Sequence, residues 1–128
     1  MTHPFRTAVE AKDVAGMIAA LAPDVCFRSP VVFKAYHGRE TVGHLLSLVA
    51  QVFEEFEYVD ELHGKDSLGL VFRARVGERQ IEGWDYLRLR PDGLIQEFTV
   101  MVRPLSGANA LAEAMGRKLG LQAGHAGG

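Results

Sequence analysis

A carboxylate in the apolar row of an alternating stretch is the group in this sequence best placed for acid chemistry. The stretch covers residues 80–90, and Asp85 shares one face of the expected strand with Ile81 and Leu87, because successive side chains of a strand point to opposite faces. A shift of one residue would bury arginines instead, so the register is well specified. Acidic side chains are almost never buried without a partner. Asp85 therefore either has a structural partner or faces a cavity made for a ligand.

Two further polar side chains could contact a ligand near the same place. His37 lies in the apolar segment 31–38, and it could exchange a proton with a ligand if that loop folds over a pocket mouth. The alternative is a solvated histidine in a surface turn. Ser29 precedes a proline, where a serine either stabilises a local turn or touches a ligand. Neither the histidines nor the single cysteine has metal-ligand spacing, so we expect no metal site and no cofactor.

Helices and a sheet must position these groups, and their periods are visible in the chain. Residues 4–21 repeat apolar side chains at helical spacing and predict a bent pair of helices. A short strand at 24–29 and a loop at 31–38 follow. Residues 39–53 carry a second apolar stripe, which predicts a helix that covers a sheet. A last helix is predicted to start near residue 106 or 109 and to end at residue 119.

Four alternating segments predict the sheet itself. Short turns separate them, so they form hairpins and consecutive strands must be antiparallel. The segments are 56–63, 67–76, 80–90 and 94–103. Helices followed by antiparallel strands indicate the α+β class. A strongly bent sheet with helices on one face would form a cone, and Asp85 would lie on the wall of its apolar pocket.

The inward face of these strands supplies the predicted pocket lining. Apolar inward residues either pack in a core or line a cavity. They are Phe27, Phe72, Leu87, Phe98, Val100 and Val102. The opposite face is not fully polar, since alternation places Trp84, Tyr86 and Ile95 on it. This favours a homodimer through Trp84 and Tyr86, with stacking on a substrate as the alternative if the register were inverted.

The composition restricts the class of protein. The chain has 128 residues, 48% hydrophobic and 23% charged, which is typical of one globular domain. We expect that domain to span residues 1–119 and residues 120–128 to form a flexible tail. A net charge of −2 with scattered signs gives no basic face for nucleic acid, and no apolar run is long enough for a membrane span. The single cysteine and the lack of a signal-peptide pattern favour a cytoplasmic protein.

Four segments carry a resemblance to a known family. They are residues 13–24, the Ser29-Pro30 pair, Gly38 before a helix, and above all residues 84–95 with the sequence Trp-Asp-Tyr-Leu-Arg-Leu-Arg-Pro-Asp-Gly-Leu-Ile. From residue 3 to about residue 104, the chain resembles the nuclear transport factor 2-like superfamily, in particular its polyketide cyclase-like and ketosteroid isomerase branch. The resemblance implies a cone-shaped α+β barrel, in which a curved antiparallel sheet wraps around N-terminal helices.

The resemblance also implies roles for three residues. Asp85 matches the position where ketosteroid isomerases keep a protonated aspartic acid that donates a hydrogen bond to an enolate oxygen. An apolar wall suits this role, because desolvation raises the pKa of a carboxyl group. The general base of the isomerases corresponds to Ser29, and their oxyanion tyrosine corresponds to Phe5, which we place in the pocket lining. A serine alone does not abstract a carbon-bound proton at neutral pH, so steroid isomerisation is not expected.

Two functions of different classes remain open from the sequence. The first is a small-molecule enzyme, an isomerase or cyclase without a cofactor, that acts on a hydrophobic carbonyl compound with Asp85 as acid or hydrogen-bond donor. The second is a non-catalytic module, in which the pocket holds a small hydrophobic molecule passively or the outer sheet face assembles a dimer. The sequence predicts the pocket without identifying its ligand.

Overall fold

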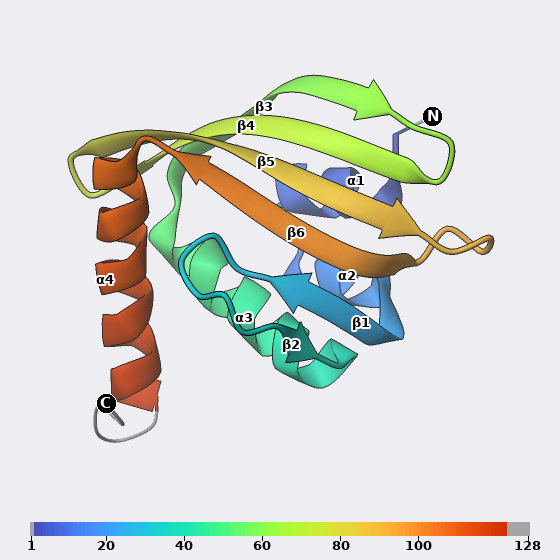
Figure 1. The fold of residues 1–128 in the computed structure, drawn as a ribbon, viewed down its shortest axis with the longest axis horizontal. Helices are drawn as coiled ribbons and strands as arrows, with labels where there is room; N and C mark the ends of the chain where they lie inside the picture. The colour runs from blue at the N-terminus through green and yellow to red at the C-terminus, as the bar shows by residue number, and fades with distance from the viewer. Residues whose placement is uncertain (1, 123–128) are drawn as a thin grey trace.

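A strongly curved sheet forms the frame of the molecule (Figure 1). The computed structural model describes residues 2–122, and these form six strands in the order β2-β1-β6-β5-β4-β3 together with four helices. In chain order the elements are α1 (Pro4–Glu10), α2 (Val14–Ala19), β1 (Leu21–Arg28), β2 (Tyr36–His37), α3 (Arg39–Val52), β3 (Glu54–His63), β4 (Ser67–Val76), β5 (Arg79–Leu89), β6 (Ile95–Arg103) and α4 (Leu105–Gln122). This mixture of helices and a curved, unclosed sheet confirms the predicted α+β cone.

Strands β3 to β6 form the predicted antiparallel meander. Their ends differ from the predicted ends by at most two residues. Asp85 lies opposite Leu70 of β4 and Val100 of β6, so it occupies the inward row in the predicted register. β1 then joins the free side of β6 in parallel. The sequence does not reveal this last pairing, because it joins segments from opposite ends of the chain.

The first strand begins earlier than the sequence predicts. β1 starts at Leu21, which the apolar stripe had assigned to a helix, and α2 consequently ends at Ala19. Leu21 pairs with Ile95 of β6 and its side chain is fully buried, so burial in the sheet outweighs the local helical period. The segment predicted as a loop contains the short strand β2, which pairs Tyr36 with Phe27 of β1.

A register shift between β5 and β6 turns Ile95 inward. Arg88 lies opposite Glu97, whereas Leu89 lies opposite Ile95, so the pairing skips one residue of β6. Simple alternation assigned Ile95 to the outer face, and that assignment is wrong, since Ile95 is fully buried in the core. The bulge reverses the face of the residues that precede it, which no periodic pattern can show.

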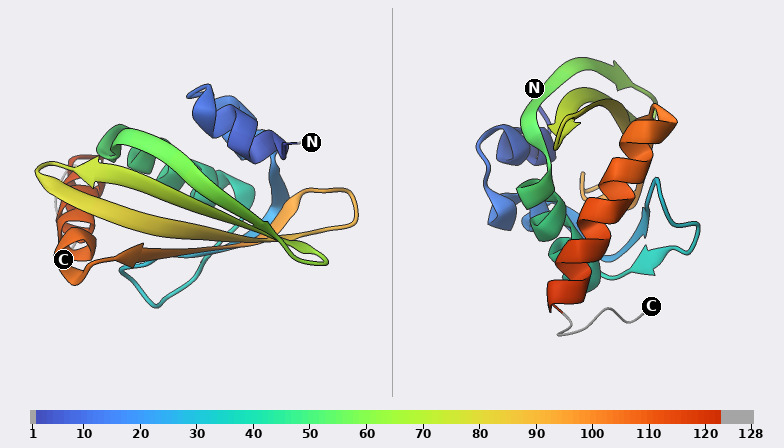
Figure 2. Two further views of the ribbon diagram at one scale, coloured as in Figure 1. Left: turned by 90° about the horizontal axis from the view of Figure 1, so that it is seen from above. Right: turned by 90° about the vertical axis from the view of Figure 1, so that its left-hand side faces the viewer.

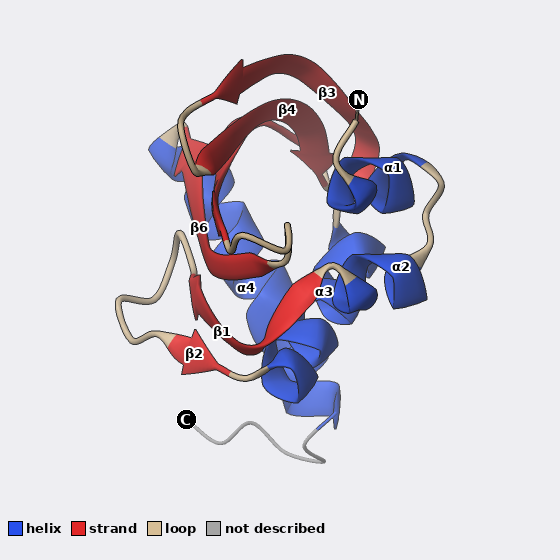
Figure 3. Cartoon of the chain, turned by 90° about the vertical axis from the view of Figure 1, so that its right-hand side faces the viewer, coloured by secondary structure: helices blue, strands red, loops and turns tan. Residues whose placement is uncertain are grey.

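The sheet curls around the first three helices (Figures 2 and 3). The outermost strand of the meander, β3, bends most and arches over α1 in Figure 3. It contains register shifts between Glu54 and Glu57 and between Tyr58 and Asp60, and Glu55 has a positive φ of 51°. Such irregularities bend a strand and increase its twist. They bring the inward side chains of β3 over the concave face of β4 and β5.

Side-chain caps fix where the two N-terminal helices begin. The Nδ1 atom of His3 accepts the amide hydrogen of Phe5 at 3.1 Å, and Pro4 occupies the first helical position of α1. Asp13 accepts the amide of Gly16 at 3.0 Å and starts α2. Because α1 begins at this point, the Phe5 side chain is buried under the curved sheet.

The last helix, α4, crosses one end of the curved sheet (Figure 2). Its Leu111 is buried, and Gly107 lies so close to β5 that a Cβ atom there would be 2.4 Å from Cγ2 of Ile81. α4 extends to Gln122, beyond the predicted end, and the remainder of the predicted tail, residues 123–128, lies outside the described residues. None of the described helices has the length and the apolar run needed to cross a membrane.

Candidate functional site

A cavity of about 1220 Å³ lies between the concave face of the sheet and the helices α1, α3 and α4. Small-molecule sites usually have volumes of roughly 300–1,000 Å³, so this cavity has room for a polycyclic compound. Its lining is mainly apolar and includes side chains from four strands of the meander. The aromatic hydrocarbon rings that line it are Phe5, Phe27, Phe53, Phe56, Phe72 and Phe98.

Asp85 is the one charged side chain among residues 2–122 that is buried, and it lines this cavity. Only 6% of its surface is exposed. Burial disfavours the charged carboxylate and raises the pKa of Asp85 from 3.8 to about 7, while the hydroxyl of Tyr58 acts in the opposite direction. The carboxyl group is therefore close to half protonated at neutral pH. It can donate a hydrogen bond where ordinary aspartates cannot.

Tyr58 of β3 places a phenol hydroxyl near this carboxyl group. Among the residues that the structure describes, its Oη is the buried side-chain polar atom that has no hydrogen-bond partner. Burial raises the pKa of Tyr58 above its ordinary value, and the charge of Asp85 raises it further. The two groups are thus close enough to influence each other without forming a hydrogen bond of normal geometry. Buried polar atoms without a partner are rare in folded proteins.

Two neighbours hold the ring of Tyr58. Phe56, on the same face of β3, packs edge-on against it, with the ring centroids 5.0 Å apart and an interplanar angle of 90°. The guanidinium of Arg6 in α1 lies 5.2 Å from the ring centroid, and its Nη1 donates to Oε1 of Glu61 at 2.7 Å. The ring is therefore fixed between α1 and β3, which limits the directions in which its hydroxyl can point.

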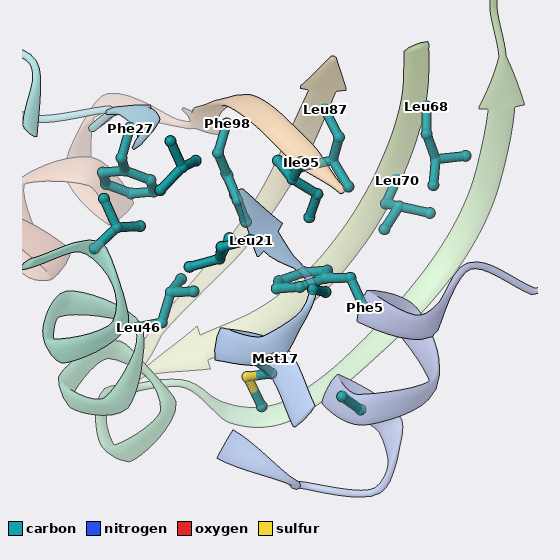
Figure 4. Close-up of a cluster of buried hydrophobic side chains, with 14 residues drawn as sticks. Phe5, Met17, Leu21, Phe27, Leu46, Leu68, Leu70, Leu87, Ile95 and Phe98 are labelled. Carbon is teal, nitrogen blue, oxygen red and sulfur yellow. The ribbon is translucent and has the colours of Figure 1, made fainter. Parts of the chain in front are cut away.

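One group of aromatic rings lies toward the β6 side of the cavity (Figure 4). Phe98 contacts Phe5 edge-on, with centroids 5.2 Å apart, and it contacts Phe27 at 5.3 Å. These rings come from α1, β1 and β6, so elements distant in the sequence meet at this wall. Figure 4 shows them beside the buried side chains of Met17 and Leu46 from α2 and α3. The wall is apolar and belongs to the main core.

A second aromatic group lies toward α3 and β4. Phe72 stacks on Phe56 at 4.8 Å with an interplanar angle of 24°, and Phe53 contacts Phe72 at 5.5 Å. Phe72 lies directly against Gly83 of β5, where a Cβ atom would be 2.2 Å from Cζ of the ring. The missing side chain at Gly83 therefore allows the ring to lie flat on the sheet. Asp85 follows two residues later on the same face.

The structure places most of the predicted pocket residues on this cavity. Leu87 and Val102 do not line it, and the prediction for these two needs correction. Leu87 is fully buried in the main core, and Val102 packs in a second cluster with Leu111 of α4. The inward row of each strand is longer than the cavity, so its ends are covered by other elements. The predicted residues that do line it are Phe5, Phe27, Ser29, Phe72, Asp85, Phe98 and Val100.

The surroundings of the two other polar candidates agree with the structural alternative predicted for each, a surface histidine for His37 and a turn serine for Ser29. His37 is exposed and does not line the cavity, whereas its neighbour Tyr36 does, because adjacent residues of a strand point to opposite sides. Ser29 lines the cavity, but its Oγ accepts the amide hydrogen of Val31 at 3.1 Å. This is the turn-forming alternative for Ser29.

Tyr58 was not among the site residues predicted from the sequence. A signal for it was present, because Phe56 and Tyr58 alternate with the polar Glu57 and therefore share one face of the predicted strand. The register shift after Tyr58 ends that alternation. Few side chains of this strand therefore point inward, and the segment is largely polar. Within residues 2–122, no group of three histidine, cysteine, aspartate or glutamate side chains is close enough to hold a metal ion.

Comparisons with known proteins place this geometry among related structures. No family model and no curated protein matches the sequence. A steroid delta-isomerase from Pseudomonas aeruginosa matches with a TM-score of 0.90 and 42% sequence identity, over 94% of this chain and 89% of that protein. An uncharacterised protein with a cystatin-like fold from Silicibacter pomeroyi matches with a TM-score of 0.85 and 35% identity, over 92% of this chain and 86% of that protein.

A more distant similarity agrees with these two. A nuclear transport factor 2-like protein of unknown function from Mesorhizobium loti matches with a TM-score of 0.69 and 19% identity, over 78% of this chain and 85% of that protein. At this identity the match concerns the fold alone. The curved sheet and its enclosing helices are thus shared with a protein of low sequence identity.

Proposed function

Because this chain belongs to the nuclear transport factor 2-like superfamily, we propose that its cavity binds a small hydrophobic compound whose carbonyl or phenol oxygen accepts a hydrogen bond from Asp85. The observation that carries the proposal is a buried carboxyl group on the wall of a largely apolar cavity. A carboxyl group inside an apolar core would normally be paired, and the aromatic lining offers flat surfaces to a ring system.

The protonation of Asp85 determines what this site can do. With a pKa raised to about 7 by burial, the carboxyl group carries a proton in a substantial fraction of molecules at neutral pH. In that form it donates to a neutral carbonyl and stabilises negative charge that develops on the oxygen. An ionised carboxylate would repel the same oxygen, so binding of a carbonyl compound should weaken as the pH rises above 7.

A second candidate function is the isomerisation of an unsaturated ketone. Its support is the 42% identity to the protein described as a steroid delta-isomerase. Such a reaction needs a base that takes a proton from one carbon and returns it to another, while Asp85 holds the oxygen. The base does not come from Ser29, whose hydroxyl is neutral and engaged by a backbone amide. Among the glutamates that border the cavity, Glu10 is close enough to raise the pKa of Tyr58, and we assign it as the candidate for this step.

Fluorescence titration with 2-naphthol tests the binding function. We expect the native protein to bind 2-naphthol at about pH 6, and Asp85→Leu to weaken that affinity about tenfold, because it removes the donor and keeps the apolar shape. Asp24→Asn, an exposed aspartate on β1 outside the cavity lining, is the matched control and should not change the affinity. Circular dichroism verifies the fold of each variant. Failure of the native protein to bind 2-naphthol or naphthalene would contradict the proposal.

The isomerase candidate has its own test. The native protein is incubated with a β,γ-unsaturated steroid ketone, and the conjugated product is followed by its ultraviolet absorbance. Turnover that Asp85→Leu abolishes and Asp24→Asn preserves would support catalysis. Binding of the steroid without turnover would remove the isomerase candidate and leave the binding function.

A further inference from the structure

We infer that the ligand of this cavity is an elongated amphipathic compound, with an oxygen-bearing ring at Asp85 and an apolar chain that extends to an opening beside Gly116 of α4. The inference rests on the proposed function, because it names the class of compound that the same cavity binds. Its starting point is Gly116, a glycine in the interior of α4 that lines the cavity. The lack of a side chain at this position leaves room for the chain of the ligand.

Neither packing nor backbone conformation requires a glycine at position 116. Nothing among residues 2–122 would lie within 4 Å of a Cβ atom there, and Gly116 does not have a positive φ. Gly107 of the same helix differs, because a Cβ atom there would be 2.4 Å from Cγ2 of Ile81. Glycine also destabilises a helix relative to alanine. The space beside Gly116 is therefore a feature of the cavity wall that a larger side chain would remove.

Asp85 and Gly116 border distant parts of the cavity. The contact between Gly107 and Ile81 gives a common reference point. Asp85 lies about 13 Å along β5 from Ile81, and Gly116 lies about 14 Å along α4 from Gly107. Because α4 crosses one end of the sheet (Figure 2), the strand and the helix lead away from this point in different directions. A two-ring compound at Asp85 would leave part of the cavity of about 1220 Å³ empty, whereas an elongated ligand would fill it.

The lining stays apolar where the cavity reaches the surface on this side. Leu119 of α4 and Val32 of the loop between β1 and β2 line the cavity, although 37% and 42% of their surfaces are exposed. A residue that lines a cavity and is also exposed lies at an opening of that cavity. Met115 and Val31 are their neighbours in the lining. An apolar chain in this opening would remove these side chains from water, which favours binding.

A second opening of the cavity is charged and does not suit an apolar chain. Glu10 and Lys12 at the end of α1, and Glu55 and Glu57 at the start of β3, line the cavity and are exposed. Figure 2 shows α1 and α2 on the other side of the molecule from the loop between β1 and β2. An apolar chain at the charged opening would displace water from these groups without replacing its hydrogen bonds. The chain therefore extends toward Gly116.

Calorimetric titration with two 4-alkylphenols tests the inference. 4-Ethylphenol and 4-heptylphenol share the ring and the hydroxyl and differ only in the length of the chain. We expect the native protein to bind 4-heptylphenol at least about a hundredfold more tightly, because each buried methylene strengthens binding about fourfold. Gly116→Phe should reduce this ratio to about tenfold or less and leave the affinity for 4-ethylphenol unchanged, because the new ring occupies the space of the chain.

Three further variants serve as controls for this titration. Asn109→Phe adds the same ring at an exposed position of α4 outside the cavity lining and should bind both phenols as the native protein does. Gly116→Leu introduces a smaller side chain that favours a helix, so it replaces Gly116→Phe if that variant is unstable. Asp85→Leu should weaken both phenols by the same factor, because their oxygens occupy one place. Circular dichroism verifies the fold of each variant.

The possible results separate this inference from the proposed function. If the native protein binds neither phenol and does not bind 2-naphthol, the proposed function fails and the inference fails with it. Binding of 2-naphthol without tighter binding of 4-heptylphenol than of 4-ethylphenol would overturn the inference alone. An unchanged ratio in Gly116→Phe and Gly116→Leu would do the same. A ratio that Glu10→Phe removes and Gly116→Phe preserves would place the chain at the charged opening, which also overturns the inference.

Discussion

Asp85 couples the stability of this fold to pH, because its proton affinity differs between the folded and unfolded chain. Burial raises the pKa of its carboxyl group from 3.8 to about 7 in the folded state. As the pH rises from 4 to 7, the unfolded chain loses this proton and the folded chain keeps it, so the free energy of unfolding decreases. A shift of about three units corresponds to a loss of about 4 kcal/mol, which is complete above pH 7.

Chemical denaturation of the native protein and Asp85→Asn across this pH range tests that coupling. Asparagine does not titrate, so the difference in unfolding free energy between the two proteins should change steadily from about pH 4 to 7 and stay constant outside that window. Using the difference removes the contribution of other carboxyl groups, such as Glu61, whose pKa is lowered by Arg6 and which acts in the opposite sense. A difference that is independent of pH would show that Asp85 has an ordinary pKa.

The buried hydroxyl of Tyr58 should lower the stability of the fold. Its Oη has no hydrogen-bond partner within residues 2–122, so Tyr58→Phe removes an unsatisfied hydroxyl and should leave the free energy of unfolding unchanged or raise it by about 1 kcal/mol. Urea denaturation without ligand measures this. Tyr86→Phe serves as the control, since it removes a hydroxyl that accepts a hydrogen bond from Arg88 at the surface. A loss of stability in Tyr58→Phe would mean that the hydroxyl already has a structural partner.

For single residues, the sequence predicts the direction of a side chain only where polar and apolar residues alternate without interruption. Asp85 lies in a regular strand between two other strands, so its inward direction follows from parity alone. Tyr58 and Ile95 lie next to register shifts, where successive side chains no longer alternate regularly between the two faces of the sheet. Bulges depend on how strands fit around the helices, which is a property of the assembled fold. The acid of the site was therefore predictable, whereas its phenol partner was not.

Two glycines of α4 provide a matched test of how this helix meets the sheet. At Gly107, an added Cβ would lie 2.4 Å from Cγ2 of the buried Ile81, whereas at Gly116 nothing lies within 4 Å. Alanine favours a helix over glycine by about 0.5–1 kcal/mol. Gly116→Ala should therefore stabilise the protein by about that amount, and Gly107→Ala should destabilise it by about 1–2 kcal/mol, because overpacking exceeds the helical gain.

Thermal or urea denaturation measures both alanine variants under one condition, and each variant serves as the control for the other. The residues of α4 that line the cavity include Leu111 and Met115, so a displaced helix should also change the affinity for naphthalene. Equal stabilities of the two variants would show that α4 does not pack tightly on β5 in solution.

The elements differ in how well the sequence defines them. α3 and the four strands of the meander have long, regular apolar periods, and their observed ends lie within two residues of the predicted ends. The region from residue 20 to residue 37 is less regular, and there β1 begins early and β2 was not predicted. Its conformation depends on pairing with β6, a contact between distant segments that local patterns do not contain.

The outer face of the sheet gives the whole molecule a surface suited to self-association. Trp84 lies between Val71 of β4 and Met101 of β6, and this apolar row crosses three strands. Trp84 is 39% exposed and Met101 is 55% exposed, so the row is open to solvent. In the adjacent row, Glu82 lies between two arginines at 3.5 and 3.6 Å, which reduces the cost of burying these charges in an interface. We propose that two copies of the chain pair through this face.

Sedimentation velocity at micromolar concentration tests the dimer. We expect the native protein to sediment as a dimer and Trp84→Glu to sediment as a monomer, because the substitution places two unpaired carboxylates at the centre of the interface. Phe33→Glu is the matched control: its ring is fully exposed in the loop before β2, away from this face, and the variant should remain dimeric. The cavity lies on the opposite, concave side of the sheet, so monomeric Trp84→Glu should still bind 2-naphthol. Lost binding in a folded monomer would mean that the dimer holds the curved sheet in the shape that the cavity needs.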